Sequence, residues 1–186
     1  MSRLKLQIIT VMIFAMLLTV ISNTTLAYYT VVDTATNVVT SGEIKLKIHE
    51  KTENGEDFPV EGVQVIPGDI VSKIVTVENQ CGHPFYLRVK LVNSAEHQQI
   101  DALESLKADI NTEKWILQPD GYLYYAEILE PGQVTDPVFT KVTVDGEQLT
   151  QDHGGATLLL TITAYAVQSE HNPAENPWDA AGWPAD

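Results

Sequence analysis

The segment "ATLLLTITAYAVQ", residues 156–168, decides the fold class of this chain. When every second position is taken together, the segment has two apolar faces. One face carries Leu158, Leu160, Ile162, Ala164 and Ala166, and the other carries Leu159, Tyr165 and Val167. A strand that is apolar on both faces is typical of the interior of a sheet, where neither face meets water. The pattern therefore predicts a central β-strand.

Much of the remaining chain alternates apolar and polar residues, which predicts half-buried strands. In "GEIKLKIHE", residues 42–50, the apolar positions are Ile44, Leu46 and Ile48. Pro67-Gly68 suits the two central positions of a type II turn between two further extended runs. About eight such strands, with a turn signal roughly every 8–15 residues, predict an all-β fold. We expect a two-sheet antiparallel sandwich that resembles a jelly roll.

One segment departs from this alternation. In "NSAEHQQIDALESLKADIN", residues 93–111, apolar residues recur at helical spacing, namely Ile100, Leu103, Leu106 and Ile110. Ser94 is a residue type that commonly caps the start of a helix. The pattern predicts one short helix, over about residues 95–108, inserted between strands.

The N-terminal residues have the organisation of a secretory leader. Two positive charges precede an uncharged apolar run from Leu6 to Ile21, and small residues stand at Thr25 and Ala27. The run is shorter than the roughly 18–20 residues that a spanning helix prefers. The pattern predicts a signal peptide over residues 1–27, cleaved between Ala27 and Tyr28, with an uncleaved membrane anchor as the alternative.

The net negative charge of the chain disfavours some classes of binding partner. Removal of residues 1–27 takes away Arg3 and Lys5 and no acidic residue, so the net charge changes from −14 to −16. Such a surface repels nucleic acid and anionic lipid, and it is typical of an extracellular protein. We therefore expect no nucleic-acid partner, and contact with a membrane only through the uncleaved leader.

The end of the chain differs in composition from the predicted sandwich domain, which we place at residues 28–167. Residues 168–186 carry three prolines and two tryptophans, so they cannot form a regular strand. Exposed tryptophan is unfavourable in water. We expect Trp178 and Trp183 to dock at least partly on the sandwich.

A search for chemistry finds no catalytic, cofactor or metal motif. "HEKTE", at His49–Glu53, begins like a zinc-protease motif, but it has Glu53 in place of the second histidine and lies at a strand end. Loop acids leave calcium binding open. Cys81 is expected to be a half-buried turn residue, with intermolecular pairing as the alternative. Tyr122 and Tyr124 share a face, which indicates cross-strand packing or a contact strip for sugar or protein.

Several motifs resemble those of exported proteins that depend on a SipW-type signal peptidase, the TasA/camelysin family. The leader end and first strand of that family match at Ala27-Tyr28-Tyr29-Thr30, Thr34-Ala35-Thr36-Asn37 and Gly42. Here the two valines Val31-Val32 delay the family's aspartate to Asp33. A second pattern matches at Pro67, Gly68, Asp69, Lys73, Val77 and Asn79.

The resemblance implies a jelly-roll sandwich and, for the branch that contains matrix fibre subunits, polymerisation through a new N-terminal strand. The candidate linking strand, Tyr28–Val39, is rich in β-forming residues, including Tyr28, Tyr29, Val31, Val32, Val38 and Val39. The expected function is an exported structural protein of the cell surface or biofilm matrix. It would associate with itself or with related subunits and be processed by a SipW-type peptidase. The alternatives are an adhesin or ligand-binding module, a camelysin-like metallopeptidase, and an N-terminal segment that serves only as the domain's own first strand.

Overall fold

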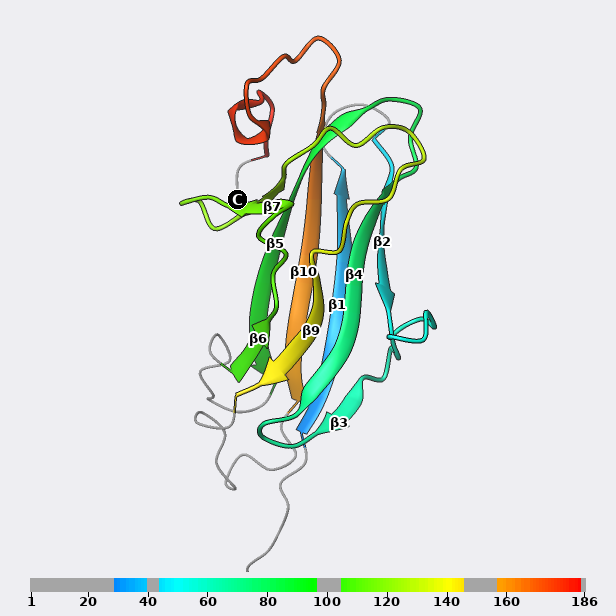
Figure 1. Cartoon of the computed structure of the whole chain (residues 1–186), viewed down its shortest axis with the longest axis vertical. Coiled ribbons are helices and arrows are strands. Elements are labelled where there is room, and N and C mark those ends of the chain that lie inside the picture. The colour runs from blue at the N-terminus through cyan, green and yellow to red at the C-terminus, as the bar shows by residue number, and fades with distance from the viewer. Residues whose placement is uncertain (1–28, 40–43, 97–104, 146–156, 185–186) are drawn as a thin grey trace, which may run out of the picture.

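The computed structural model describes residues 29–39, 44–96, 105–145 and 157–184, and it consists of two sheets packed face to face (Figure 1). The predicted all-β, two-sheet sandwich is confirmed. The chain passes back and forth between the sheets, so strands that are close in sequence commonly lie in different layers. None of the helices in the described residues is long and apolar enough to cross a membrane.

The first sheet has six strands. Their spatial order is β3 (Val63–Val65), β1 (Tyr29–Val39), β10 (Thr157–Gln168), β5 (Phe85–Glu96), β8 (Leu123–Tyr125) and β7 (Trp115–Leu117). The strand with two apolar faces, β10, lies between β1 and β5, which confirms that it is central. It is antiparallel to β5 but parallel to β1.

The second sheet has four strands. Their order is β2 (Leu46–Lys51), β4 (Ile70–Asn79), β9 (Phe139–Val144) and β6 (Leu106–Ala108). Its three strand pairs are antiparallel. Where β4 meets β9 the register shifts between Ser72 and Val75, which marks a bulge or irregularity.

Alternation along the strands places the core between the two sheets. On β5, Phe85, Leu87 and Val89 are buried. On β10 every second residue from Leu158 to Ala166 is buried, and so is Val167. Burial of these apolar side chains contributes roughly 25 cal/mol for each Å² removed from water, which makes the core the main stabilising element.

The turn between β3 and β4 follows the predicted type II geometry. Gly68 has a φ of 93°, which glycine adopts without steric cost. The Asp69 amide donates to the carbonyl of Ile66 at 3.0 Å, and this closes the turn. The Asp69 carboxylate accepts in return from the Ile66 amide. The turn brings β4 back over β3 in the opposite sheet.

The predicted helix over residues 95–108 is wrong at both ends. Strand β5 continues through Ala95 to Glu96, and β6 occupies Leu106–Ala108. Residues 97–104 lie outside the described residues. Leu106 is buried and pairs with Val144 of β9, so the packing of the sandwich, rather than helical spacing, places this apolar residue.

Candidate functional site

The candidate linking strand forms β1, in the interior of the six-stranded sheet. Each residue from Thr30 to Val39 is in register with a residue of β10, from Thr157 to Ala166. On its other side, Tyr29–Val31 pairs with β3. The structure thus places Tyr29, Val31, Val32, Val38 and Val39 together on one strand. Ala27 and Tyr28 lie outside the described residues, so the predicted cleavage site stays a prediction.

The β1 strand fills a slot that the rest of the sheet leaves between β3 and β10. Val31 is buried and belongs to the main core. Among the described residues, β3 has no other strand partner than β1. Without β1, the long edge of β10 would present unpaired backbone groups, and each such group costs about 1–3 kcal/mol when it is buried. In the folded protein β1 satisfies these backbone groups of β10 and joins β3 to the sheet.

A buried lysine lies inside the sandwich. The side chain of Lys73, on β4, is 2% exposed and its Nζ lies 3.5 Å from Oε2 of Glu50 on β2. The same Nζ lies 4.6 Å from the centre of the Phe58 ring. The Phe58 amide donates to the carbonyl of Glu50, which holds the ring beside the pair.

Burial shifts both members of this pair towards their neutral forms. Loss of water raises the pKa of Glu50 to about 7 and lowers the pKa of Lys73 to about 7. The carboxylate oxygen Oε1 of Glu50 meets no hydrogen-bond partner among the described residues. The pair therefore gains or loses charge in the neutral pH range, where most surface carboxylates and lysines do not titrate.

A second buried cation, Arg88 on β5, lies on the outer face of the six-stranded sheet. Its guanidinium carbon is 3.7 Å from the ring centre of Tyr122, and the rings of Tyr165, Trp183 and Tyr124 lie at 5.3, 4.8 and 5.8 Å. Its Nη1 donates to the hydroxyl of Tyr124 at 3.0 Å. We call these five residues the Arg88 cluster. It is a cation–π arrangement in which aromatic faces surround a desolvated guanidinium.

The C-terminal segment, residues 169–184, covers the Arg88 cluster. Nη2 of Arg88 donates to the Pro184 carbonyl at 2.7 Å. The Trp183 and Trp178 rings meet the Tyr124 ring edge-on, with ring centres 5.4 and 6.3 Å apart. The segment contains a short 3₁₀ turn, Pro177–Asp179. Nε1 of Trp183 donates a hydrogen bond to the Pro177 carbonyl of this turn. The predicted docking of both tryptophans is confirmed.

This covering decides between the two interpretations of the tyrosines. Tyr122 and Tyr124 are both buried. The hydroxyl of Tyr124 donates to Asp120 at 2.7 Å, and Tyr125 points to the opposite side, where it packs against Trp115. The tyrosines are therefore packing residues in this structure, and their contact partner is the chain's own C-terminal segment.

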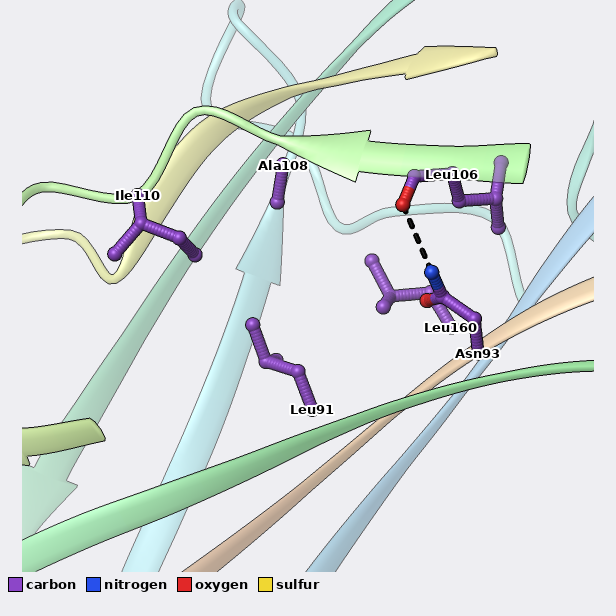
Figure 2. A pocket seen from close by; sticks show the side chains of 6 residues that line it. All are labelled: Leu91, Asn93, Leu106, Ala108, Ile110 and Leu160. Carbon is purple, nitrogen blue, oxygen red and sulfur yellow. Dashed lines mark hydrogen bonds between the residues drawn. The ribbon is translucent and has the colours of Figure 1, made fainter. Parts of the chain in front are cut away.

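A small open cavity of about 200 Å³ lies between β5, β6 and β10 (Figure 2). Its lining is apolar except for one amide, and consists of Leu91, Asn93, Leu106, Ala108, Ile110 and Leu160. Nδ2 of Asn93 donates to the Leu106 carbonyl at 2.8 Å. The lining contains no titratable group, so the cavity suits an apolar group and has no catalytic chemistry of its own.

The remaining sequence candidates are structural. His49 lies on strand β2, where its Nε2 is 2.8 Å from Oε2 of Glu78. Cys81 is half-buried, as expected, and its thiol contacts Oδ1 of Asn79 at 2.9 Å and the His83 carbonyl at 3.0 Å. Within the described ranges, no group of three His, Cys, Asp or Glu residues is placed to hold a metal ion.

Sequence reasoning did not single out Lys73 or Arg88 as site residues. Lys73 had a detectable signal, because it shares a face with Val75 and Val77 in the alternation of β4. Arg88 had no such signal nearby, because it stands on the polar face of β5 and is covered by residues about 90 positions further along the chain.

Comparison with protein-family models, with curated proteins and with solved structures found no match to this chain.

Proposed function

We propose that this protein is an exported structural subunit of the cell surface or biofilm matrix, and that copies associate through the N-terminal strand β1. The observation that carries the proposal is the position of β1. The segment that directly follows the predicted cleavage site occupies an interior slot of a six-stranded sheet and is paired on both sides. The motifs shared with SipW-dependent proteins support the same role.

If copies exchange β1, each copy receives an identical strand from its neighbour. The same strand fills the same slot in either case, so the hydrogen bonds and the burial of Val31 are conserved. The free-energy difference between the two arrangements then comes from the connection to β2, from repulsion between acidic subunits and from protein concentration. While the leader is attached, the start of β1 stays tethered at the membrane. Cleavage by a SipW-type peptidase would release it for pairing.

The test is to trap β1 against β10 by a disulfide. Thr34 and Thr161 are partners in the β1–β10 register, so the variant Thr34→Cys/Thr161→Cys, in a Cys81→Ser background, places two thiols side by side. If β1 links copies, oxidation of the mature chain gives a ladder of covalent oligomers on a denaturing gel. If β1 stays within its own chain, oxidation gives only cross-linked monomer, and the proposal fails.

A matched control uses the same cysteine on β10. Thr161 is also in register with Val92 of β5, a pair that lies within one chain. Val92→Cys/Thr161→Cys must give cross-linked monomer alone. Because the acidic subunits repel one another, we also expect more oligomer as salt rises, since charges are screened over about 8–10 Å at 0.1–0.15 M ionic strength.

A further inference from the structure

The C-terminal segment is held in shape by contacts within itself. The Asn172 side chain donates to the Ala181 carbonyl at 2.9 Å and accepts from the Ala181 amide at 3.0 Å, which joins the two ends of the segment. Between them, Nε1 of Trp183 donates to the Pro177 carbonyl at 3.1 Å. Residues 172–184 therefore form a small folded unit that can move as one piece.

This unit packs outside the main core. Ala180 forms a small apolar cluster with Tyr86 and Val167, separate from the core between the two sheets, and Ala174 and Trp183 pack against it. Figure 1 shows the segment beyond the end of β10, to one side of the two sheets. Its departure would uncover the small cluster and the Arg88 cluster, and would leave the core between the sheets closed.

The surface beneath the segment is specific for it. This docking surface is the Arg88 cluster without Trp183, namely Arg88, Tyr122, Tyr124 and Tyr165. Its guanidinium donates to the Pro184 carbonyl, and the Tyr124 ring meets the Trp183 ring edge-on. Residues 169–184 carry three acidic side chains and no lysine or arginine. The surface thus selects an acidic peptide with tryptophan and proline, whichever copy carries it.

The connection between β10 and the docked unit is a constrained turn. The Asn172 amide donates to the Ser169 carbonyl at 3.2 Å, and His171, which lies between them, has a φ of 60°. This left-handed region favours glycine, because other residues meet a steric penalty there. Among the described residues, His171 is the one residue other than glycine with a positive φ. Straightening this turn removes the constraint and carries residues 172–184 away from their own sheet.

We propose that two copies of this chain exchange their C-terminal segments, with the turn at residues 169–172 as the hinge. Residues 172–184 of each copy then dock on the docking surface of the other. The contacts between unit and surface are the same in both arrangements, while the open hinge no longer holds a left-handed residue. The exchange is reciprocal, so it closes a dimer. This inference goes beyond the proposed function, because it involves neither β1 nor removal of the leader.

The first test changes the hinge in the full mature chain. Proline holds φ near −65°, so His171→Pro prevents the closed turn, whereas His171→Gly adopts it without strain. The dimer dissociation constant, measured by analytical ultracentrifugation, should be at least about tenfold lower for His171→Pro than for His171→Gly. With Trp178→Ala/Trp183→Ala added to both chains, the two constants should agree. Equal constants without these added changes overturn the inference.

The second test mixes two chains that each lack one half of the contact. The Arg88→Met chain keeps the segment but has a damaged docking surface, and the Trp178→Ala/Trp183→Ala chain keeps the surface but has a damaged segment. With a fluorescent label on one chain, the mixture should associate more strongly than either chain alone. Tyr124→Leu removes the ring that meets both tryptophans, and it replaces Arg88→Met if that chain does not fold. A mixture that associates no more than the separate chains overturns the inference.

The cysteine cross-links between β1 and β10 report separately on the proposed function, because the exchange of β1 uses neither the hinge nor the docking surface. Cross-linked monomer together with extra association in the mixture rejects assembly through β1 and supports exchange of the C-terminal segment. Covalent ladders without extra association in the mixture do the reverse.

Discussion

Lys73 and Arg88 are both buried cations on long strands, but their surroundings differ. Lys73 faces the interior of the sandwich, where Oε2 of Glu50 lies 3.5 Å from its Nζ and the Phe58 ring lies beside it. Arg88 faces outward and is covered by the C-terminal segment. A hydroxyl, a carbonyl, four aromatic rings and the Asp120 carboxylate, 3.8 Å from Nη1, surround it.

The difference follows from the chemistry of the two groups. A guanidinium is planar and weakly hydrated, so stacked rings and a few oriented acceptors replace its water. An ammonium is compact and strongly hydrated, so burial lowers the pKa of Lys73 to about 7. We therefore expect the region around Lys73 to respond to pH and the Arg88 cluster to act as a pH-independent clamp. Three experiments sharpen or break this comparison.

The largest effect is expected for Lys73→Met. Removal of the ammonium leaves Glu50 buried without a cation, so the unfolding free energy should fall by about 3–5 kcal/mol near pH 7, where the folded protein still holds charge on Lys73. The pKa of Glu50 is already raised in the folded state, from 4.5 to about 7, so the folded protein binds an extra proton in this window. Stability from Glu50 is therefore lost as pH rises through that range.

The loss caused by Lys73→Met should accordingly shrink as the solution is acidified. Near pH 5 Glu50 is protonated, and the Lys73 charge is itself unfavourable, because its pKa in the folded state is lowered. Denaturant titrations at several pH values measure this trend. Addition of Glu50→Gln should recover part of the loss near pH 7. A loss that stays constant with pH would show that Lys73 stabilises the fold by packing alone.

A smaller and pH-independent effect is expected for Arg88→Met. This change removes the contacts to Tyr124 and Pro184 and the interactions with the rings, which together should cost about 2–4 kcal/mol. The C-terminal segment should loosen, and the fluorescence of Trp178 and Trp183 should shift to the red while the core residue Trp115 stays buried. Arg88→Lys keeps the charge but not the planar group, and should recover only part of the loss. Unchanged emission in Arg88→Met would contradict the clamp.

The smallest effects are expected for the two tryptophans of the C-terminal segment. Trp183 lies against both Arg88 and Tyr124 and donates to the Pro177 carbonyl, so Trp183→Ala should cost about 1–2 kcal/mol. Trp178 has one edge contact, with Tyr124, so Trp178→Ala should cost less. Thermal unfolding and limited proteolysis of the two variants show which substitution destabilises the protein more. A larger loss for Trp178→Ala would place the anchor of the segment elsewhere.

The sequence predicts the layers of this fold better than the order of its strands. Alternation along residues 42–50 is a local property, and the burial of Ile44, Leu46 and Ile48 confirms it. The parallel pairing of β1 with β10 joins segments at opposite ends of the chain, and no local pattern encodes it. The helical spacing predicts a helix through Leu106, but the pairing of β6 with β9 makes that residue part of a strand.

For the candidate site, too, the sequence predicts local features and not the contacts between distant segments. The β-forming composition of residues 28–39 predicts a strand, and the structure contains one, but composition does not say what the strand pairs with. Tryptophans in a proline-rich segment predict docking, because their apolar area is large. They do not reveal Arg88 as the residue on which they dock, since its burial depends on contacts across the whole fold.

The β1–β10 pairing has a mechanical consequence. Thr30 to Val39 run alongside Thr157 to Ala166 in one unbroken parallel register. A pull on the N-terminal end of β1 along its own axis loads this whole ladder in shear, so its hydrogen bonds must yield together and not one after another as in a zipper. A fibre joined by such strands would resist stretching along its length. It would give way far more easily to a sideways force that peels β1 from one end.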